Sequence, residues 1–159
     1  MQYRDNTASL TLFLSQVRLY DIVSNNQRCS YSHSMPVLDC TFQDPIHVWS
    51  GGLDNTLKCY DINSSQESSL GTHDNAIKCV EYSSDLNVIV TGSWDGTVKV
   101  WDQRAGNPCT GVYSQPDKVY TMSVAGDKLV VGTAGRKVIE QQHGTVAYSA
   151  SWCRCGCGT

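Results

Sequence analysis

The chain has 159 residues, which is the size of one domain or of part of a larger one. Its net charge of -3 and its 17% of charged residues argue against a nucleic-acid-binding surface, because such surfaces need clustered lysine and arginine. A hydrophobic share of 40% excludes charge-driven disorder, and no apolar run approaches the ~18 residues of a membrane-spanning helix. The residues before Leu10 hold no apolar signal-peptide core, so we expect an intracellular, reducing environment.

An aromatic residue followed by aspartate recurs at intervals of 40 and 41 residues, as Tyr20-Asp21, Tyr60-Asp61 and Trp101-Asp102. The segment 49–61 aligns with the segment 90–102, and five of the 13 aligned positions are identical. Each unit contains short runs of β-branched residues, and Asp95-Gly96 is a strong hairpin signal. A ~40–45-residue unit of strands that ends in Trp-Asp is typical of one four-stranded blade of a WD-repeat β-propeller.

This repeat divides the chain into three parts. We expect residues 1–22 to be the remnant of a first blade, because two residues lead from Ser15 to Val17 where seven lead from Ser50 to Leu57. Residues 23–139 should form a partial propeller, with blades at about 31–62, 73–103 and 113–139. The pattern stops after residue 139, and residues 140–159 form an off-pattern tail. The predicted fold is all-β, an incomplete propeller of about three blades.

These motifs resemble the WD-repeat family, whose blades contain a buried network of a histidine, a hydroxyl, an aspartate and a tryptophan. The resemblance implies this role for His73, Thr91, Asp95 and Trp101 in one blade, and for His33, Ser50, Asp54 and Tyr60 in the preceding one. Histidine, hydroxyl and carboxylate together can also indicate a catalytic triad. A catalytic site occurs once, whereas this set recurs in each blade. We therefore expect a structural network and no enzymatic activity.

Several segments, among them 17–21, 49–54, 114–121 and 131–136, resemble a narrower group, the WD-repeat propellers of the spindle assembly checkpoint that partner the Bub kinases. The resemblance covers roughly residues 17–139 and implies a non-catalytic, seven-bladed propeller, of which this chain holds about three blades. It implies a nuclear protein that docks at kinetochores. Its expected partners are short peptide motifs of checkpoint kinases and a phosphorylated kinetochore scaffold. The alternative is the related messenger-RNA-export propeller, which binds nuclear-pore peptides.

Trp94 matches a tryptophan of the peptide-binding surface of the checkpoint propellers, so the resemblance implies that it contacts the kinase peptide. Its alternative role is that of a rim aromatic packed on the next blade. Lys58 and Lys99 are expected to be solvated charges on outward strand positions. We expect no cofactor, no metal, no direct nucleic-acid or membrane contact and no small-molecule substrate.

Three cysteines crowd the tail, at Cys153, Cys155 and Cys157. This spacing is a weak match to a zinc site, because zinc sites usually pair cysteines as C-x₂₋₄-C with a second pair far off. The tail can be the product of translation out of frame or through an intron, a lineage-specific ending, or a segment that binds a soft metal ion. The first is favoured, and it predicts a truncated or mis-spliced form of a longer propeller.

Overall fold

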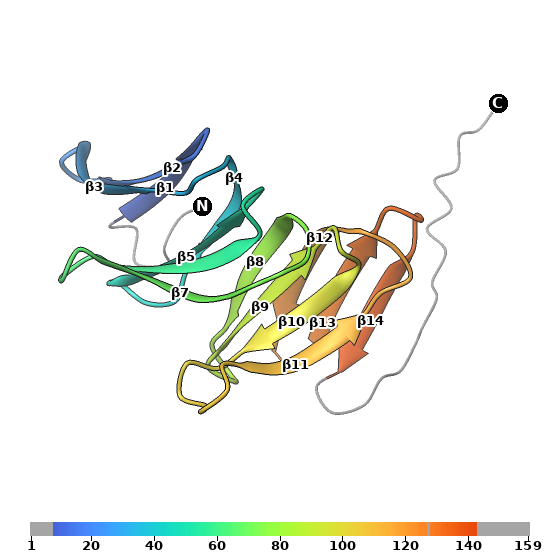
Figure 1. Ribbon diagram of the computed structural model, residues 1–159. Coiled ribbons are helices and arrows are strands. Elements are labelled where there is room, and N and C mark those ends of the chain that lie inside the picture. Colours follow the sequence, from blue (N-terminus) through green and yellow to red (C-terminus); the bar gives the residue numbers. More distant parts are fainter. Residues whose placement is uncertain (1–7, 127, 143–159) are drawn as a thin grey trace.

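The computed structural model describes residues 8–126 and 128–142 (Figure 1). These residues form fourteen β-strands and no helix, so none of them forms a helix that could cross a membrane. All the strand pairs are antiparallel. The cysteine-rich segment of the tail lies outside the described residues.

The strands form four sheets in chain order. Sheet 1 contains β1 (Ala8–Phe13), β2 (Gln16–Asp21) and β3 (Asn26–Ser32). Sheet 2 contains β4 (Val37–Phe42), β5 (His47–Gly52), β6 (Thr56–Asp61) and β7 (Gln66–Thr72). Sheet 3 contains β8 (Ile77–Ser83), β9 (Val88–Ser93), β10 (Thr97–Trp101) and β11 (Cys109–Ser114). Sheet 4 contains β12 (Val119–Ala125), β13 (Lys128–Thr133) and β14 (Val138–Gln142).

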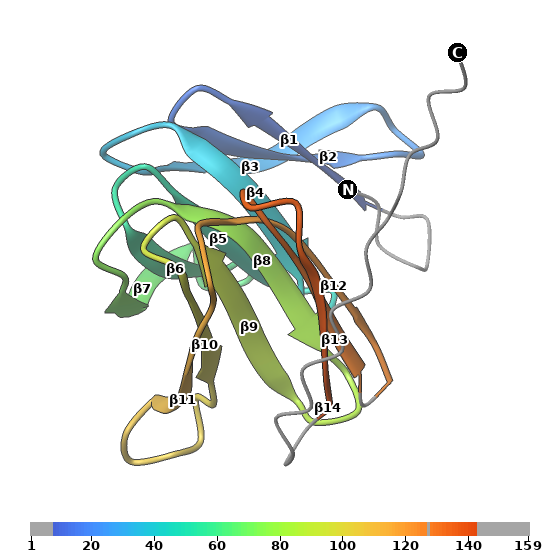
Figure 2. The same cartoon turned by 90° about the vertical axis from the view of Figure 1, so that its right-hand side faces the viewer.

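The sheets follow one another like the blades of a propeller, from sheet 1 on one side to sheet 4 on the other (Figure 1). Their first strands lie side by side, β4 next to β8 and β8 next to β12 (Figure 2). The prediction of an incomplete WD-repeat β-propeller is confirmed. A propeller buries the flank of each sheet against the next, and this sets which residues form the core.

The predicted blade bounds are wrong by about one strand. The complete sheets span residues 37–72 and 77–114, not 31–62 and 73–103, because the strand that follows each aromatic-Asp pair folds back onto the same sheet. The first unit extends past residue 22 and is a three-stranded sheet that ends at Ser32. Strand β14 continues to Gln142, into the predicted tail. The outer strands β7 and β11 hold no fully buried residue, since they lie at the sheet edge, and this weakens their sequence signal.

Tight turns join the second and third strands of sheets 2, 3 and 4. Each turn has one residue in the left-handed region, namely Asn55 (φ 62), Gly96 (φ 78) and Arg136 (φ 56). Sheet 1 has only the two-residue link of Leu14 and Ser15 at this place, as the sequence predicts. Asn and Gly adopt a positive φ at low cost, so the first two turns are encoded locally.

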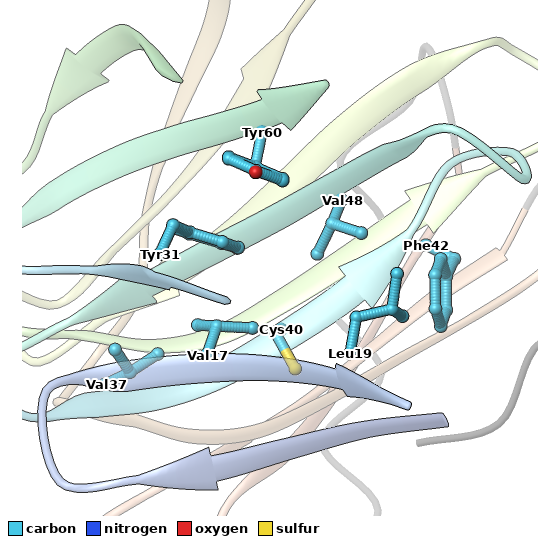
Figure 3. Close-up of a cluster of buried hydrophobic side chains, with 8 residues drawn as sticks. All are labelled: Val17, Leu19, Tyr31, Val37, Cys40, Phe42, Val48 and Tyr60. Carbon is cyan, nitrogen blue, oxygen red and sulfur yellow. The ribbon is translucent and has the colours of Figure 1, made fainter. Parts of the chain in front are cut away.

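Three apolar clusters fill the junctions between successive sheets. Figure 3 shows the first, in which side chains of sheets 1 and 2 meet: Val17, Leu19, Tyr31, Val37, Cys40, Phe42, Val48 and Tyr60. At the next junctions a glycine of one sheet receives a branched side chain of the following sheet. A Cβ atom on Gly51 would lie 2.5 Å from Ile77, and one on Gly92 would lie 2.6 Å from Val119.

Two lysines cross these junctions, which corrects the prediction that they are solvated charges. Lys58 Nζ donates to the Ser32 carbonyl at 2.9 Å, and Lys99 Nζ donates to the Thr72 carbonyl at 2.9 Å. Each lysine stands on the third strand of its sheet and reaches the end of the outer strand of the preceding sheet. The alternation of side chains along the strand predicts to which face each lysine side chain points. It cannot predict the carbonyl that accepts its hydrogen bond, because that carbonyl belongs to a different sheet.

A carboxylate pair lies where the first strands of sheets 2 and 3 meet. The Asp39 carboxylate accepts the backbone N–H of Val80 at 2.9 Å and that of Cys40 at 2.9 Å, and so bridges β4 and β8. Glu81 follows on β8. Burial, and after it the charge of Asp39, raises the pKa of Glu81 to about 7 from its ordinary 4.5.

We expect Glu81→Gln to stabilise the protein increasingly as the pH rises. Because its folded pKa is raised, Glu81 binds more protons in the folded than in the unfolded chain between pH 4.5 and about 7, so its contribution falls as the pH rises through this window. The difference in Tm between variant and parent, followed by circular dichroism, should be small near pH 4.5 and largest above about 7. The exposed carboxylate variant Asp85→Asn is the control. A pH-independent difference for Glu81→Gln would contradict the assignment.

Candidate functional site

The four residues predicted to form a network in sheet 3 are brought together. His73 lies 2.9 Å from Asp95 through Nδ1 and 2.7 Å from Thr91 Oγ1 through Nε2. Trp101 Nε1 donates to Thr91 Oγ1 at 2.8 Å. These contacts define one donor chain, in which the indole donates to Thr91, the Thr91 hydroxyl to His73, and His73 Nδ1–H to Asp95. Each group is satisfied once the histidine is the neutral Nδ1–H tautomer.

Sheet 2 contains the matching network with one change. His33 lies 2.8 Å from Asp54 through Nδ1 and 2.8 Å from Ser50 Oγ through Nε2. The donor to Ser50 is the hydroxyl of Tyr31 at 2.8 Å, not Tyr60 as the sequence predicts. Tyr60 instead stacks on Tyr31, with ring centroids 4.6 Å apart and an interplanar angle of 7°. Tyr31 stands in sheet 1, so the missing tryptophan is replaced across a sheet junction, which the repeat alignment cannot reveal.

The electrostatics of the network favour a neutral histidine beside an ionised aspartate. Burial lowers the pKa of His73, against the hydrogen bond to Asp95, which raises it. Burial opposes the ionisation of Asp95, but the hydrogen bonds from Thr97 and His73 prevail and lower its pKa. His73 and Thr91 are 4% and 0% exposed, so a substrate has no access to the pair. This arrangement fixes a turn and does not present a nucleophile.

In the described part of the chain, no group of three or more His, Cys, Asp or Glu side chains is placed to hold a metal ion. Three strand cysteines, Cys40, Cys59 and Cys79, are buried in the core. Burial raises the pKa of each of these three thiols to about 12. A thiol with so high a pKa is a poor nucleophile and a poor ligand.

Trp94 lies apart from the networks, in the turn between β9 and β10. The turn is held to its neighbours by backbone hydrogen bonds from Trp94 to Ala76 (3.0 Å) and from Gln115 to Gly96 (2.7 Å). The indole ring is half-buried and lies 6.0 Å from the ring of Tyr120, at an angle of 40°. The indole Nε1 is buried without a hydrogen-bond partner. Oε1 of Gln115, the residue whose backbone N–H bonds to Gly96 of the turn, is also buried without a partner. The ring of Trp94 thus packs beside Tyr120 of the next sheet, and its buried N–H has no partner within the described residues.

Further apolar side chains stand at the same end of the sheets. Tyr120 is 48% exposed, Met35 47% and Leu14 71%. Backbone bonds link the turns at this end, as in Val37 to Leu14 (2.8 Å) and His73 to Asn55 (2.9 Å). We call the surface formed by Trp94 and Tyr120 the Trp94 face. Sequence analysis singled out Trp94 and not Tyr120, which lies at a β-bulge at the start of β12.

Comparison with known proteins agrees with this architecture. Residues 64–102 match the family described as WD domain, G-beta repeat. A solved structure titled as the computationally designed Ika4 protein matches with a TM-score of 0.76 and 26% identity, over 87% of this chain and 86% of that chain. The chain is thus a WD-repeat β-propeller protein, incomplete in the part described.

Within that class the sequence is similar to the Bub3 mitotic checkpoint proteins. It is 46% identical over 127 residues to "Mitotic checkpoint protein BUB3.1" of Arabidopsis thaliana, which covers 77% of this chain and 37% of the relative. It is also 39% identical over 129 residues to "mRNA export factor GLE2" of Chaetomium thermophilum, over 77% of this chain and 36% of the relative. The chain spans a little over a third of the length of these relatives. The predicted resemblance to the checkpoint propellers is confirmed.

Proposed function

We propose that the protein is a non-catalytic adaptor of the mitotic spindle assembly checkpoint, which binds short peptide motifs of checkpoint kinases and docks on a phosphorylated kinetochore scaffold in the nucleus. The similarity to a mitotic checkpoint relative at 46% identity supports the class of role. The single observation that carries the binding role is Trp94, a half-buried aromatic in a rim turn beside the half-exposed ring of Tyr120. No cofactor, metal or small-molecule substrate enters this proposal.

The Trp94 face has the chemistry that an extended peptide needs. Its half-exposed rings offer contact area at a low entropic cost, and Trp and Tyr are enriched among residues that dominate binding energies. The Trp94 ring and the 48% exposed Tyr120 ring, whose centroids lie 6.0 Å apart, would supply the apolar contact surface for the peptide.

We expect Trp94→Ala to weaken the binding of a fluorescently labelled kinase-motif peptide by more than tenfold, which is the loss of about 2 kcal/mol typical of a dominant aromatic. Fluorescence anisotropy measures this loss. Val112→Ala is the control, because Val112 is 56% exposed on the outer strand β11, away from the Trp94 face. Equal affinities for Trp94→Ala, the control and the parent would remove Trp94 from the binding surface.

The messenger-RNA-export role remains the second candidate, supported by the 39% identity to an mRNA export factor. The two roles differ in the peptide that they predict. Parallel titrations with a kinase-motif peptide and a nuclear-pore peptide distinguish them, since the checkpoint role predicts tighter binding of the first. Tighter binding of the nuclear-pore peptide would overturn the checkpoint proposal in favour of export.

A further inference from the structure

A cleft of about 60 Å³ lies at the junction of sheets 2 and 3, at the opposite end of the strands from the Trp94 face. Val88, at the start of β9, lines this cleft, whereas Trp94 follows the other end of the same strand. The side chains of Ile89 and Trp101, which are 2% and 3% exposed, form its apolar part. Both sheets at this junction have four strands, so the cleft is formed by complete sheets.

Two amide side chains at the rim of the cleft are held by hydrogen bonds on one side only. Gln43 lies in the turn after β4, where its backbone N–H bonds to the His47 carbonyl at 3.0 Å. Its Oε1 accepts from Trp49 Nε1 at 2.8 Å and from Gln103 Nε2 at 3.1 Å. Because an indole nitrogen can only donate, the contact with Trp49 fixes the orientation of the Gln43 amide. The amide N–H2 of Gln43 and the Oε1 of Gln103 have no hydrogen-bond partner within the described residues.

A third amide lines the same cleft, at Asn87 in the turn between β8 and β9. Its Oδ1 accepts the hydroxyl of Tyr82 at 3.0 Å, and its N–H2 has no partner in the part of the chain that the structure describes. The cleft therefore offers two amide N–H2 donors and one amide oxygen, each on a side chain whose other end is already bonded.

The two charged residues of the lining neutralise each other. Arg104 donates to the Asp102 carboxylate through Nε at 2.8 Å and through Nη2 at 2.9 Å. These hydrogen bonds lower the pKa of Asp102 and raise that of Arg104, so both groups are ionised at neutral pH. A carboxylate in the cleft would meet the charge of Asp102 and could not donate to Gln103. An ammonium would meet the charge of Arg104 and could not accept from Gln43, so the lining favours an uncharged ligand.

We propose that this cleft binds an uncharged amide group of a partner protein. The amide oxygen accepts from Gln43 and Asn87 through its two lone pairs, and the amide N–H donates to Gln103. The cleft has room for about four water molecules, which suits one such group and not a longer side chain. A main-chain peptide group and the side chain of Asn or Gln both carry this chemistry. The proposal uses no residue of the Trp94 face and does not rest on the proposed peptide binding there.

Titrations of the isotope-labelled full chain, followed by NMR spectroscopy, test the proposal. N-methylacetamide is the probe for a main-chain group, acetamide is the probe for an Asn or Gln side chain, and acetate is the charged control. We expect saturable shifts of the Gln43 side-chain N–H2 signals and of the Trp49 indole signal with the amides, and the tighter amide identifies the source. Trp49 is 1% exposed and should respond through its bond to Gln43, whereas the Trp94 indole should not respond. Shifts that do not saturate with either amide, or equal affinity for acetate, would overturn the proposal.

A substitution at the rim tests the role of the amide oxygen. Gln103→Met keeps the length of an exposed side chain and removes its amide, so it should weaken amide binding by about two- to tenfold, the loss typical of one neutral hydrogen bond. Gln27→Met is the matched control, because Gln27 is exposed on the outer strand β3 of sheet 1. Circular dichroism on each variant checks that the sheets are retained. Unchanged affinity for Gln103→Met, or an equal loss for Gln27→Met, would contradict the proposed binding mode.

Discussion

Replacing Trp101 by alanine should lower the free energy of unfolding by about 3–5 kcal/mol, the cost of removing a large buried aromatic. The side chain is 3% exposed and belongs to the apolar cluster between sheets 2 and 3. The substitution opens a cavity and also leaves Thr91 without the indole donor at the start of the buried donor chain. Packing and hydrogen bonding are lost together, so the effect lies at the high end for a single substitution.

Urea unfolding followed by circular dichroism measures this loss, and Trp94→Ala is the matched control. Both variants remove an indole from sheet 3, but Trp94 is half-buried in a turn and its N–H has no partner. Trp101→Phe should fall between parent and alanine variant, because it keeps most of the ring and loses the donor. Losses of equal size for Trp94→Ala and Trp101→Ala would show that the network carries no special share of the stability.

Gly51→Val should destabilise the protein by about 1–3 kcal/mol or more through overpacking. The added Cβ alone would lie 2.5 Å from Ile77 Cγ2 and 2.8 Å from Ile77 Cβ, well inside van der Waals contact. Ile77 is 0% exposed and cannot move aside without disturbing the junction of sheets 2 and 3. The clash therefore pushes two sheets apart and does not merely shift one rotamer.

Thermal unfolding with near-ultraviolet circular dichroism tests this prediction, since Trp49 lies in the affected cluster and reports on its packing. Gly106→Val is the control, because a Cβ atom at Gly106 meets no atom within 4 Å. Comparable melting of the Gly51 and Gly106 variants would mean that the strand propensity of valine, and not the sheet junction, governs the outcome.

The two networks show how the chain tolerates a departure from its own repeat. In sheet 3 the donor to the hydroxyl comes from the same sheet, as Trp101. In sheet 2 a tyrosine of the preceding sheet supplies it, as Tyr31, and the residue at the repeat position stacks on that tyrosine. Both solutions satisfy the same buried groups, since a buried hydroxyl and imidazole need partners wherever these come from.

The resemblance to the WD-repeat family implied the network of His73, Thr91, Asp95 and Trp101. The sequence by itself determined the repeat, the strand-rich units and the tight turns. These features follow from local pattern, because strand alternation, the Asp-Gly turn and the 41-residue spacing are written within each unit. Only the tertiary structure showed to which sheet each outer strand belongs and that Tyr31, not Tyr60, donates to Ser50. It also showed that Lys58 and Lys99 donate hydrogen bonds to carbonyls of the preceding sheet. Each of these depends on contact between units about 40 residues apart, where the partner is set by how the sheets stack and not by any neighbouring residue.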